Sequence, residues 1–147
     1  GQGPLTEELQ RIAREAGVAE RVAFVGRIPE SELPAWYHAC DVFCLPSVEP
    51  AEAFGIVQVE AMACGKPVLC CQLGNGVNWV NPDGETGLTV PPKDAGALGA
   101  ALRRLLSDDA LRARLGEEGR HRAYRLFSAE AVAAGTLAVY REVLARP

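Results

Sequence analysis

Three glutamates, Glu49, Glu52 and Glu60, lie in the otherwise almost wholly apolar stretch EPAEAFGIVQVEAM, at positions 49–62, and the last two are eight residues apart. Glu52 precedes Phe54 and Gly55, and Glu60 follows them. A carboxylate accepts hydrogen bonds through both of its oxygens, which suits the neighbouring hydroxyls of a ribose or a hexose. The two side chains could therefore hold a sugar, provided that the fold brings them to one place.

The backbone between the two glutamates favours an anion close to them. The stretch follows a predicted strand, 41–45, and continues into a predicted helix, 55–64, so that Glu52 lies in the connecting loop. The first N–H groups of a helix have no partner within it and, with the helix dipole, favour a phosphate group. Here those groups belong to Phe54, Gly55, Ile56 and Val57. Glu60 lies about one turn inside the helix and leans back toward the same end, so the combination predicts a site for a sugar diphosphate.

Other interpretations of the two glutamates stay open on spacing alone. Glu52 could simply complement the helix dipole while Glu60 is a solvated helical position. A glycosidase could use the pair as acid and base, although the adjoining helix N-terminus suits a phosphate better. A nucleotide-binding module without catalytic activity is a third possibility, against which the presence of both glutamates argues.

The composition narrows the class of protein. The chain has 147 residues, 48% apolar and 23% charged, proportions typical of a soluble globular protein, and its length fits one domain, 1–147. The net charge of −4 argues against a nucleic-acid-binding protein, which would normally be basic. No apolar run has membrane-spanning length, and we expect no signal peptide and a cytoplasmic protein.

Neither the five cysteines nor the two histidines favour a metal site. The cysteines show no C-x-x-C spacing and the histidines lie far apart, so we expect no zinc. No Asp-x-Asp pair is present that could hold a diphosphate through a metal ion. Cys70 and Cys71 end an apolar run, and alternation along a strand should send their side chains to opposite, buried faces.

Helices and strands alternate along the chain. Continuous apolar runs predict four strands, at 21–26, 41–45, 68–71 and 87–90. Helices are predicted at 5–16, 29–39 and 55–64 and after residue 94, where Ser107 and Ser128 are candidate N-caps. Apolar strands that are each followed by a helix are typical of a parallel sheet covered on both faces. The sequence therefore predicts an α/β fold, a Rossmann-like parallel sheet with helices on both faces, with ligands at the carboxyl ends of the strands.

The sequence also resembles the retaining glycosyltransferases of family 4, also called group 1, which have the GT-B fold. EAFGIVQVE matches the E-x7-E motif of that family. Five further stretches resemble its successive C-terminal-domain blocks in order: GQGPLTEELQRIAREAG, RVAFVGRIPESELPAWYHACDVFCLPS, EAMACGKPVL, NPDGETGLTVPP and RLFSAEAVAAGTLAVYREVL. In the family this half binds the nucleotide sugar, and a separate N-terminal domain binds the acceptor.

The resemblance implies roles for single residues. Glu52 would hold hydroxyls of the transferred sugar and stabilise positive charge, and Glu60 would hold the ribose. The backbone beside them, from Phe54, Gly55, Ile56 and Val57, would line the sugar and the diphosphate. Arg27 and Ile28 match the loop that contacts the base.

One segment departs from the family pattern. After the strand 68–71 the family usually has a glycine pair and an acidic residue, whereas this chain reads GNGVNWV, beginning at Gly74 and Asn75. Contact of Asn75 or Asn78 with the sugar and a simple turn both stay open. Trp79 could shield the pocket, although we expect it in the core.

The activity implied for the complete enzyme is transfer of a sugar from a UDP- or GDP-sugar to a glycan, lipid-linked or polysaccharide acceptor, with retention at the anomeric carbon. No cofactor or metal is implied beyond the nucleotide-sugar donor. The enzyme would be bacterial, and cytoplasmic or peripheral to the inner face of the membrane. The first strands of the family's donor domain would precede Gly1, so we expect this chain alone to be inactive, and its truncated sheet to pair its remaining strands or to self-associate.

Overall fold

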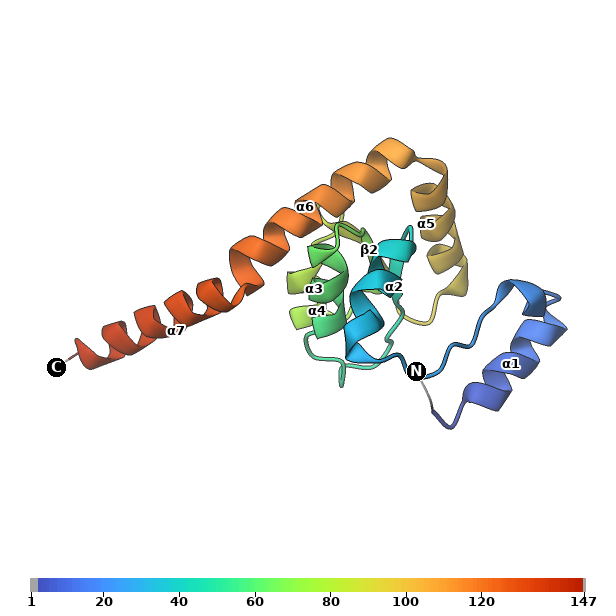
Figure 1. Ribbon diagram of the computed structural model, residues 1–147, viewed down its shortest axis with the longest axis horizontal. Coiled ribbons are helices and arrows are strands. Elements are labelled where there is room, and N and C mark those ends of the chain that lie inside the picture. Colours follow the sequence, from blue (N-terminus) through green and yellow to red (C-terminus); the bar gives the residue numbers. More distant parts are fainter. Residues whose placement is uncertain (1–2, 147) are drawn as a thin grey trace. The chain divides into compact units, whose positions relative to one another are not determined.

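The structure, a computed structural model, describes residues 3–146, and the chain divides into two compact units after Pro34 (Figure 1). No helix among these residues is both long and apolar enough to cross a membrane. That residues 1–147 act as one domain stays a prediction.

The first unit contains α1 (Thr6–Glu15) and two short 3-10 helices, η1 (Ala19–Arg21) and η2 (Glu30–Glu32). Residues 3–6 and Leu9, at the start of α1, line a cavity of about 470 Å³ together with residues 23–26. The predicted strand at 21–26 is wrong, because no described residue pairs with this segment and Phe24 is 41% exposed. A strand is completed only by the backbone of a neighbouring strand, so an apolar run without one stays irregular.

The second unit is built on a parallel sheet, which in the described residues has three strands in the order β1-β2-β3. They are β1 (Phe43–Leu45), β2 (Val68–Cys71) and β3 (Gly87–Val90). Cys44 lies opposite Leu69, which in turn lies opposite Leu88. The two strands at 68–71 and 87–90 have the predicted bounds, which confirms the parallel α/β fold.

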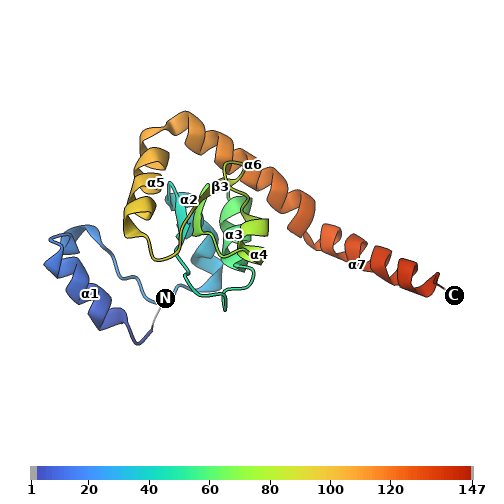
Figure 2. The same cartoon turned by 180° about the vertical axis from the view of Figure 1, so that it is seen from behind.

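Six helices belong to the described part of this unit. They are α2 (Leu33–Ala39, whose first two residues precede the boundary), α3 (Ile56–Ala63), α4 (Gly76–Val80), α5 (Ala95–Ser107), α6 (Asp109–Phe127) and α7 (Ala129–Leu144). Five of them connect or cover the strands, whereas the last, α7, extends away from the sheet beyond α6 and has no buried residue (Figure 1). Figures 1 and 2 show α6 running along the unit from α5 to α7, and its contact with α3 is the most extensive between two helices. The short helix α4 was not predicted.

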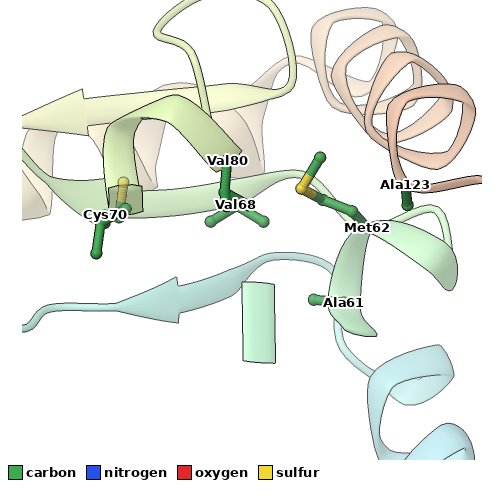
Figure 3. Packing of buried hydrophobic residues seen from close by; sticks show 7 residues of the cluster. Ala61, Met62, Val68, Cys70, Val80 and Ala123 are labelled. Carbon is green, nitrogen blue, oxygen red and sulfur yellow. The ribbon is translucent and has the colours of Figure 1, made fainter. Parts of the chain in front are cut away.

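Buried residues form one cluster against each face of the sheet. The first cluster takes Val68 and Cys70 from β2 and packs them against α3, α4 and α6 (Figure 3). The second takes Leu69 and Cys71 from the same strand and packs them against β3, α5 and α6. This alternation confirms that the two adjacent cysteines point to opposite buried faces. Helices on both faces follow from a strand that is apolar at every position.

Side chains at the helix starts explain where the C-terminal helices begin. Ser128 caps α7 by accepting the N–H of Ala131, as predicted. The prediction for Ser107 is wrong by one residue: Asp108 caps α6, accepting the N–H of Leu111 at 2.8 Å. Both residue types can take this position, and the aspartate adds a negative charge at the positive end of the helix dipole.

Candidate functional site

The loop that contains Glu52 joins the carboxyl end of β1 to the start of α3. Gly55 ends the loop with a φ of 71°, and a Cβ at this position would lie 2.6 Å from Gln58 Nε2 and 2.9 Å from Leu45 Cδ2. Only glycine accommodates both this conformation and this spacing. The side chain of Glu52 turns back, and its Oε1 accepts the N–H of Gly55 at 3.1 Å. Glu52 therefore lies at the N-terminus of α3. This position fits a sugar-binding role and also the alternative in which Glu52 only complements the helix dipole.

The start of α3 keeps free donors beside this carboxylate. No acceptor among the described residues meets the N–H groups of Ile56 and Val57. Ile56 is exposed and Val57 half-buried. Two such groups at the positive end of a helix dipole can donate to an anion. Of the four N–H groups predicted to face an anion, that of Gly55 is engaged by Glu52, whereas those of Ile56 and Val57 have no acceptor among the described residues; anion binding here stays a prediction.

A second loop, after β2, is connected to the first by Asn75. Its Oδ1 caps α4 by accepting the N–H of Val77 at 3.0 Å, and its Nδ2 donates to the backbone oxygen of Glu52 at 2.9 Å. A simple turn at this segment is therefore wrong, because Asn75 starts a helix. Gly74 lies beside it on the surface, with a positive φ. The carboxyl ends of parallel strands share one edge of the sheet, so the two loops meet there.

Asn78 holds the second loop in shape. Its Oδ1 accepts the N–H groups of Leu73 and Gly74 at 2.7 and 2.8 Å, and its Nδ2 donates to Cys71 O at 3.0 Å. Since its amide is engaged on both sides by backbone, it serves as a support of the loop. This leaves Asn75 as the asparagine that touches the glutamate loop.

Glu60 extends from the second turn of α3 and is exposed, but it has a protein partner. Tyr37 of α2 donates its hydroxyl to Glu60 Oε2 at 2.6 Å. Burial of the phenol, followed by the hydrogen bond to Glu60, raises the pKa of Tyr37 above its usual value. The interpretation of Glu60 as a merely solvated position is therefore incomplete, because a side chain from another helix orients its carboxylate.

Gln58 is a buried residue that sequence reasoning missed. Its Nε2 donates to the backbone oxygens of Phe54 and Val77, both at 3.3 Å, and so connects the glutamate loop, α3 and α4. The residue is fully buried in the middle of the E-x7-E stretch. A polar side chain in an apolar helix was the available signal, because such groups are buried only with partners.

Trp79 corrects another prediction. It is 55% exposed, so the expected core position is wrong. Its ring meets that of Phe127 edge to face, with centroids 5.3 Å apart, and lies 6.2 Å from that of Phe54. The guanidinium of Arg122 lies over it at 5.5 Å. The side chain thus lies between Phe54 and the last turns of α6.

Arg27 and Ile28 belong to the first unit, in an irregular segment, where Arg27 is exposed and Ile28 half-buried. Their predicted contact with a nucleotide base stays a prediction.

Comparison with known proteins identifies one family. The family model described as "Glycosyl transferases group 1" matches residues 1–122. A GDP-mannose-dependent alpha-(1-6)-phosphatidylinositol monomannoside mannosyltransferase from Mycolicibacterium smegmatis is 42% identical over 126 residues, 82% of this chain and 33% of the relative.

Two solved structures extend the comparison to the fold. Sucrose-phosphate synthase from Thermosynechococcus elongatus matches with a TM-score of 0.84 and 38% identity, over 99% of this chain and 37% of that protein. The Anabaena protein HepE, solved in complex with UDP, matches with a TM-score of 0.82 and 28% identity, over 90% of this chain and 36% of that protein. The chain thus spans about a third of the length of each of these three proteins.

Proposed function

This chain belongs to the glycosyl transferases of group 1, and from that membership we propose that it is the donor-binding part of a retaining hexosyltransferase. The complete enzyme would transfer a sugar from a UDP- or GDP-sugar to a glycan, lipid-linked or polysaccharide acceptor. One observation carries the proposal: a carboxylate and free N–H groups lie together where α3 begins at the carboxyl edge of the sheet. A donor with a diphosphate and a hydroxyl-rich sugar needs both kinds of partner.

Glu52 is proposed to hold the transferred sugar. Because the N–H of Gly55 engages Oε1, the carboxylate has a fixed position and its other oxygen can accept a sugar hydroxyl. As the bond to the diphosphate breaks, positive charge grows on the anomeric carbon, and a negative side chain held nearby lowers the energy of that state. Glu52 acts in this proposal through its charge and position, without forming a covalent bond.

The N–H groups at the start of α3 are proposed to stabilise the leaving diphosphate. Negative charge on the diphosphate increases during transfer, and prearranged donors at a helix N-terminus interact more strongly with the more highly charged state. The acceptor would attack from the face that the diphosphate leaves, which gives retention. We propose no metal for this step, since the chain has no Asp-x-Asp pair.

Glu60 is proposed to bind the ribose, and Arg27 and Ile28 the base. The similar proteins support a nucleotide-sugar donor but leave the base open, since one is named for GDP-mannose and another was solved with UDP. Since the chain spans about a third of those proteins, we propose that a further domain binds the acceptor. We also propose that the enzyme is cytoplasmic or peripheral to the inner face of the membrane.

The chain by itself is proposed to self-associate through its unpaired extended segment. Residues 22–25 are apolar and exposed and pair with no described strand, and such backbone recruits a partner strand. Light scattering should give a mass above that of a monomer, and a strictly monomeric chain at high concentration would contradict this.

The experiment that tests the function is a thermal-shift screen of the complete enzyme against UDP-, GDP- and ADP-sugars. A ligand at one hundred times its Kd stabilises the folded state by about 2.7 kcal/mol, so the correct donor should stand out. Transfer to an acceptor with the donor that binds would then be measured by product analysis, including the anomeric configuration. Binding without transfer would favour a non-catalytic module, and hydrolysis of a nitrophenyl glycoside would favour a glycosidase.

A further inference from the structure

The helices α2 and α3 are joined at two points. The hydroxyl of Tyr37 donates to Glu60 Oε2 at 2.6 Å, and Lys66 Nζ, just beyond α3, donates to the backbone oxygen of His38 at 2.8 Å. Both views of the molecule show the two helices side by side (Figures 1 and 2). The position of Tyr37 relative to α3 is therefore determined by more than its own hydrogen bond.

The ring of Tyr37 is also held in place by packing. It meets Phe43 of β1 edge to face, with centroids 5.6 Å apart and an interplanar angle of 60°. It packs against the cluster that contains Met62 and Val68. The side chain is half-buried, and its hydroxyl extends toward Glu60. A phenol is protonated at neutral pH, so the hydroxyl of Tyr37 is the donor and the carboxylate of Glu60 the acceptor.

This arrangement leaves one oxygen of Glu60 available. Oε2 is engaged by Tyr37, whereas no donor among the described residues reaches Oε1. A free glutamate at an exposed helical position would populate several rotamers and would have to be ordered by its ligand. With one oxygen held by a rigid phenol, the carboxylate is ordered before the ligand arrives.

We propose that Tyr37 is a positioning residue for nucleotide binding: it holds one oxygen of Glu60 so that the other faces the vicinal hydroxyls of the ribose. This rests on the proposed function, in which Glu60 binds the ribose. Tyr37 does not touch the nucleotide itself. Its contribution should therefore appear only with a ligand that has the ribose hydroxyls, and only while Glu60 is present.

The test uses Tyr37→Phe in the complete enzyme, since this variant keeps the ring and removes only the hydroxyl. Titration calorimetry would compare the nucleoside diphosphate of the preferred donor with its 2′,3′-dideoxy analogue. We expect Tyr37→Phe to weaken the ribose-containing ligand about tenfold and to leave the dideoxy analogue unchanged. Tyr124→Phe is the matched control, because Tyr124 lies on α6 and is 63% exposed.

The Glu60→Ala background separates this inference from the proposed function. There, removal of the Tyr37 hydroxyl should weaken neither ligand further. Equal weakening of both ligands by Tyr37→Phe, no weakening of either, or loss of folding in that variant would overturn the positioning role. If the Glu60→Ala enzyme still binds the nucleoside diphosphate more tightly than its dideoxy analogue by the full wild-type factor, Glu60 does not bind the ribose. That result would overturn the proposed role of Glu60 independently of the result for Tyr37→Phe.

Discussion

Replacing Gly55 by alanine should lower the stability of the folded chain, because it disturbs the start of α3. The residue has a φ of 71°, and the new Cβ would lie within 3 Å of two side chains, Gln58 and Leu45. Gln58 cannot simply turn away, because it is fully buried and its amide donates to Phe54 O and Val77 O. The substitution therefore combines a backbone penalty with the loss of buried hydrogen bonds.

The magnitude follows from these two contributions. A non-glycine residue in the left-handed region costs roughly 1–2 kcal/mol. Each hydrogen bond of Gln58 that is lost costs about 0.5–1.5 kcal/mol. Gly55→Ala should thus lower the free energy of unfolding by roughly 2–4 kcal/mol.

Gly84→Ala is the control that isolates the backbone contribution. Gly84 has a nearly equal φ of 74°, but a Cβ there would meet nothing within 4 Å. Gly84→Ala should therefore lower the free energy of unfolding by only about 1–2 kcal/mol. Urea denaturation of the chain, followed by circular dichroism, measures both variants. At a slope of about 2 kcal/mol per M, the midpoint of Gly55→Ala should fall by about 1–2 M. Equal losses in the two variants would refute the close packing of Gly55 and Gln58.

Four further predictions concern the site and the core. Glu60→Ala in the complete enzyme should weaken the nucleoside diphosphate by about one to two orders of magnitude, since a hydrogen bond to a charged group contributes roughly 1.5–3 kcal/mol. Glu52→Ala should leave that affinity nearly unchanged while transfer collapses; calorimetry showing equal losses would contradict the division of roles. Burial raises the pKa of Cys70 to about 11 from 9.0, so the folded state binds the thiol proton more tightly than the unfolded state does. The free energy of unfolding that this contributes is present below pH 9 and should decline as the pH rises toward 11. Denaturation at pH 8 and 10.5, with Cys70→Ala as reference, would detect the decline. Asn81→Ala should lower the free energy of unfolding by roughly 2–3 kcal/mol, because the buried amide bonds both β2 and Thr86; a loss below 1 kcal/mol would be inconsistent with that network.

The clearest correct strand prediction is the one whose residues are all apolar. Val68–Cys71 is apolar at every position, and both faces of this strand are buried in the structure. The run at 21–26 is also mostly apolar, yet it forms no strand. Composition reports that a segment is suited to a sheet, but pairing depends on which other strands are present.

The helix α4 was missed for a different reason. It has five residues, which is too short for an apolar period to be recognised. What starts it is a single interaction, the cap that Asn75 provides to the N–H of Val77. A glycine-asparagine-glycine segment favours both turns and caps, so its residues alone do not decide between them.

The candidate site shows where sequence reasoning reaches its limit. The E-x7-E stretch, the glycine and the first N–H groups of α3 are all local, and each could be predicted from its neighbours along the chain. The two contacts that order the glutamates are not local: Asn75 donates to the backbone of Glu52, and Tyr37 to the side chain of Glu60. These partners come from different elements, one after β2 and the other before β1. Each glutamate is therefore oriented independently of the other, and this is the physical reason why substitutions at the two should separate sugar transfer from nucleotide binding.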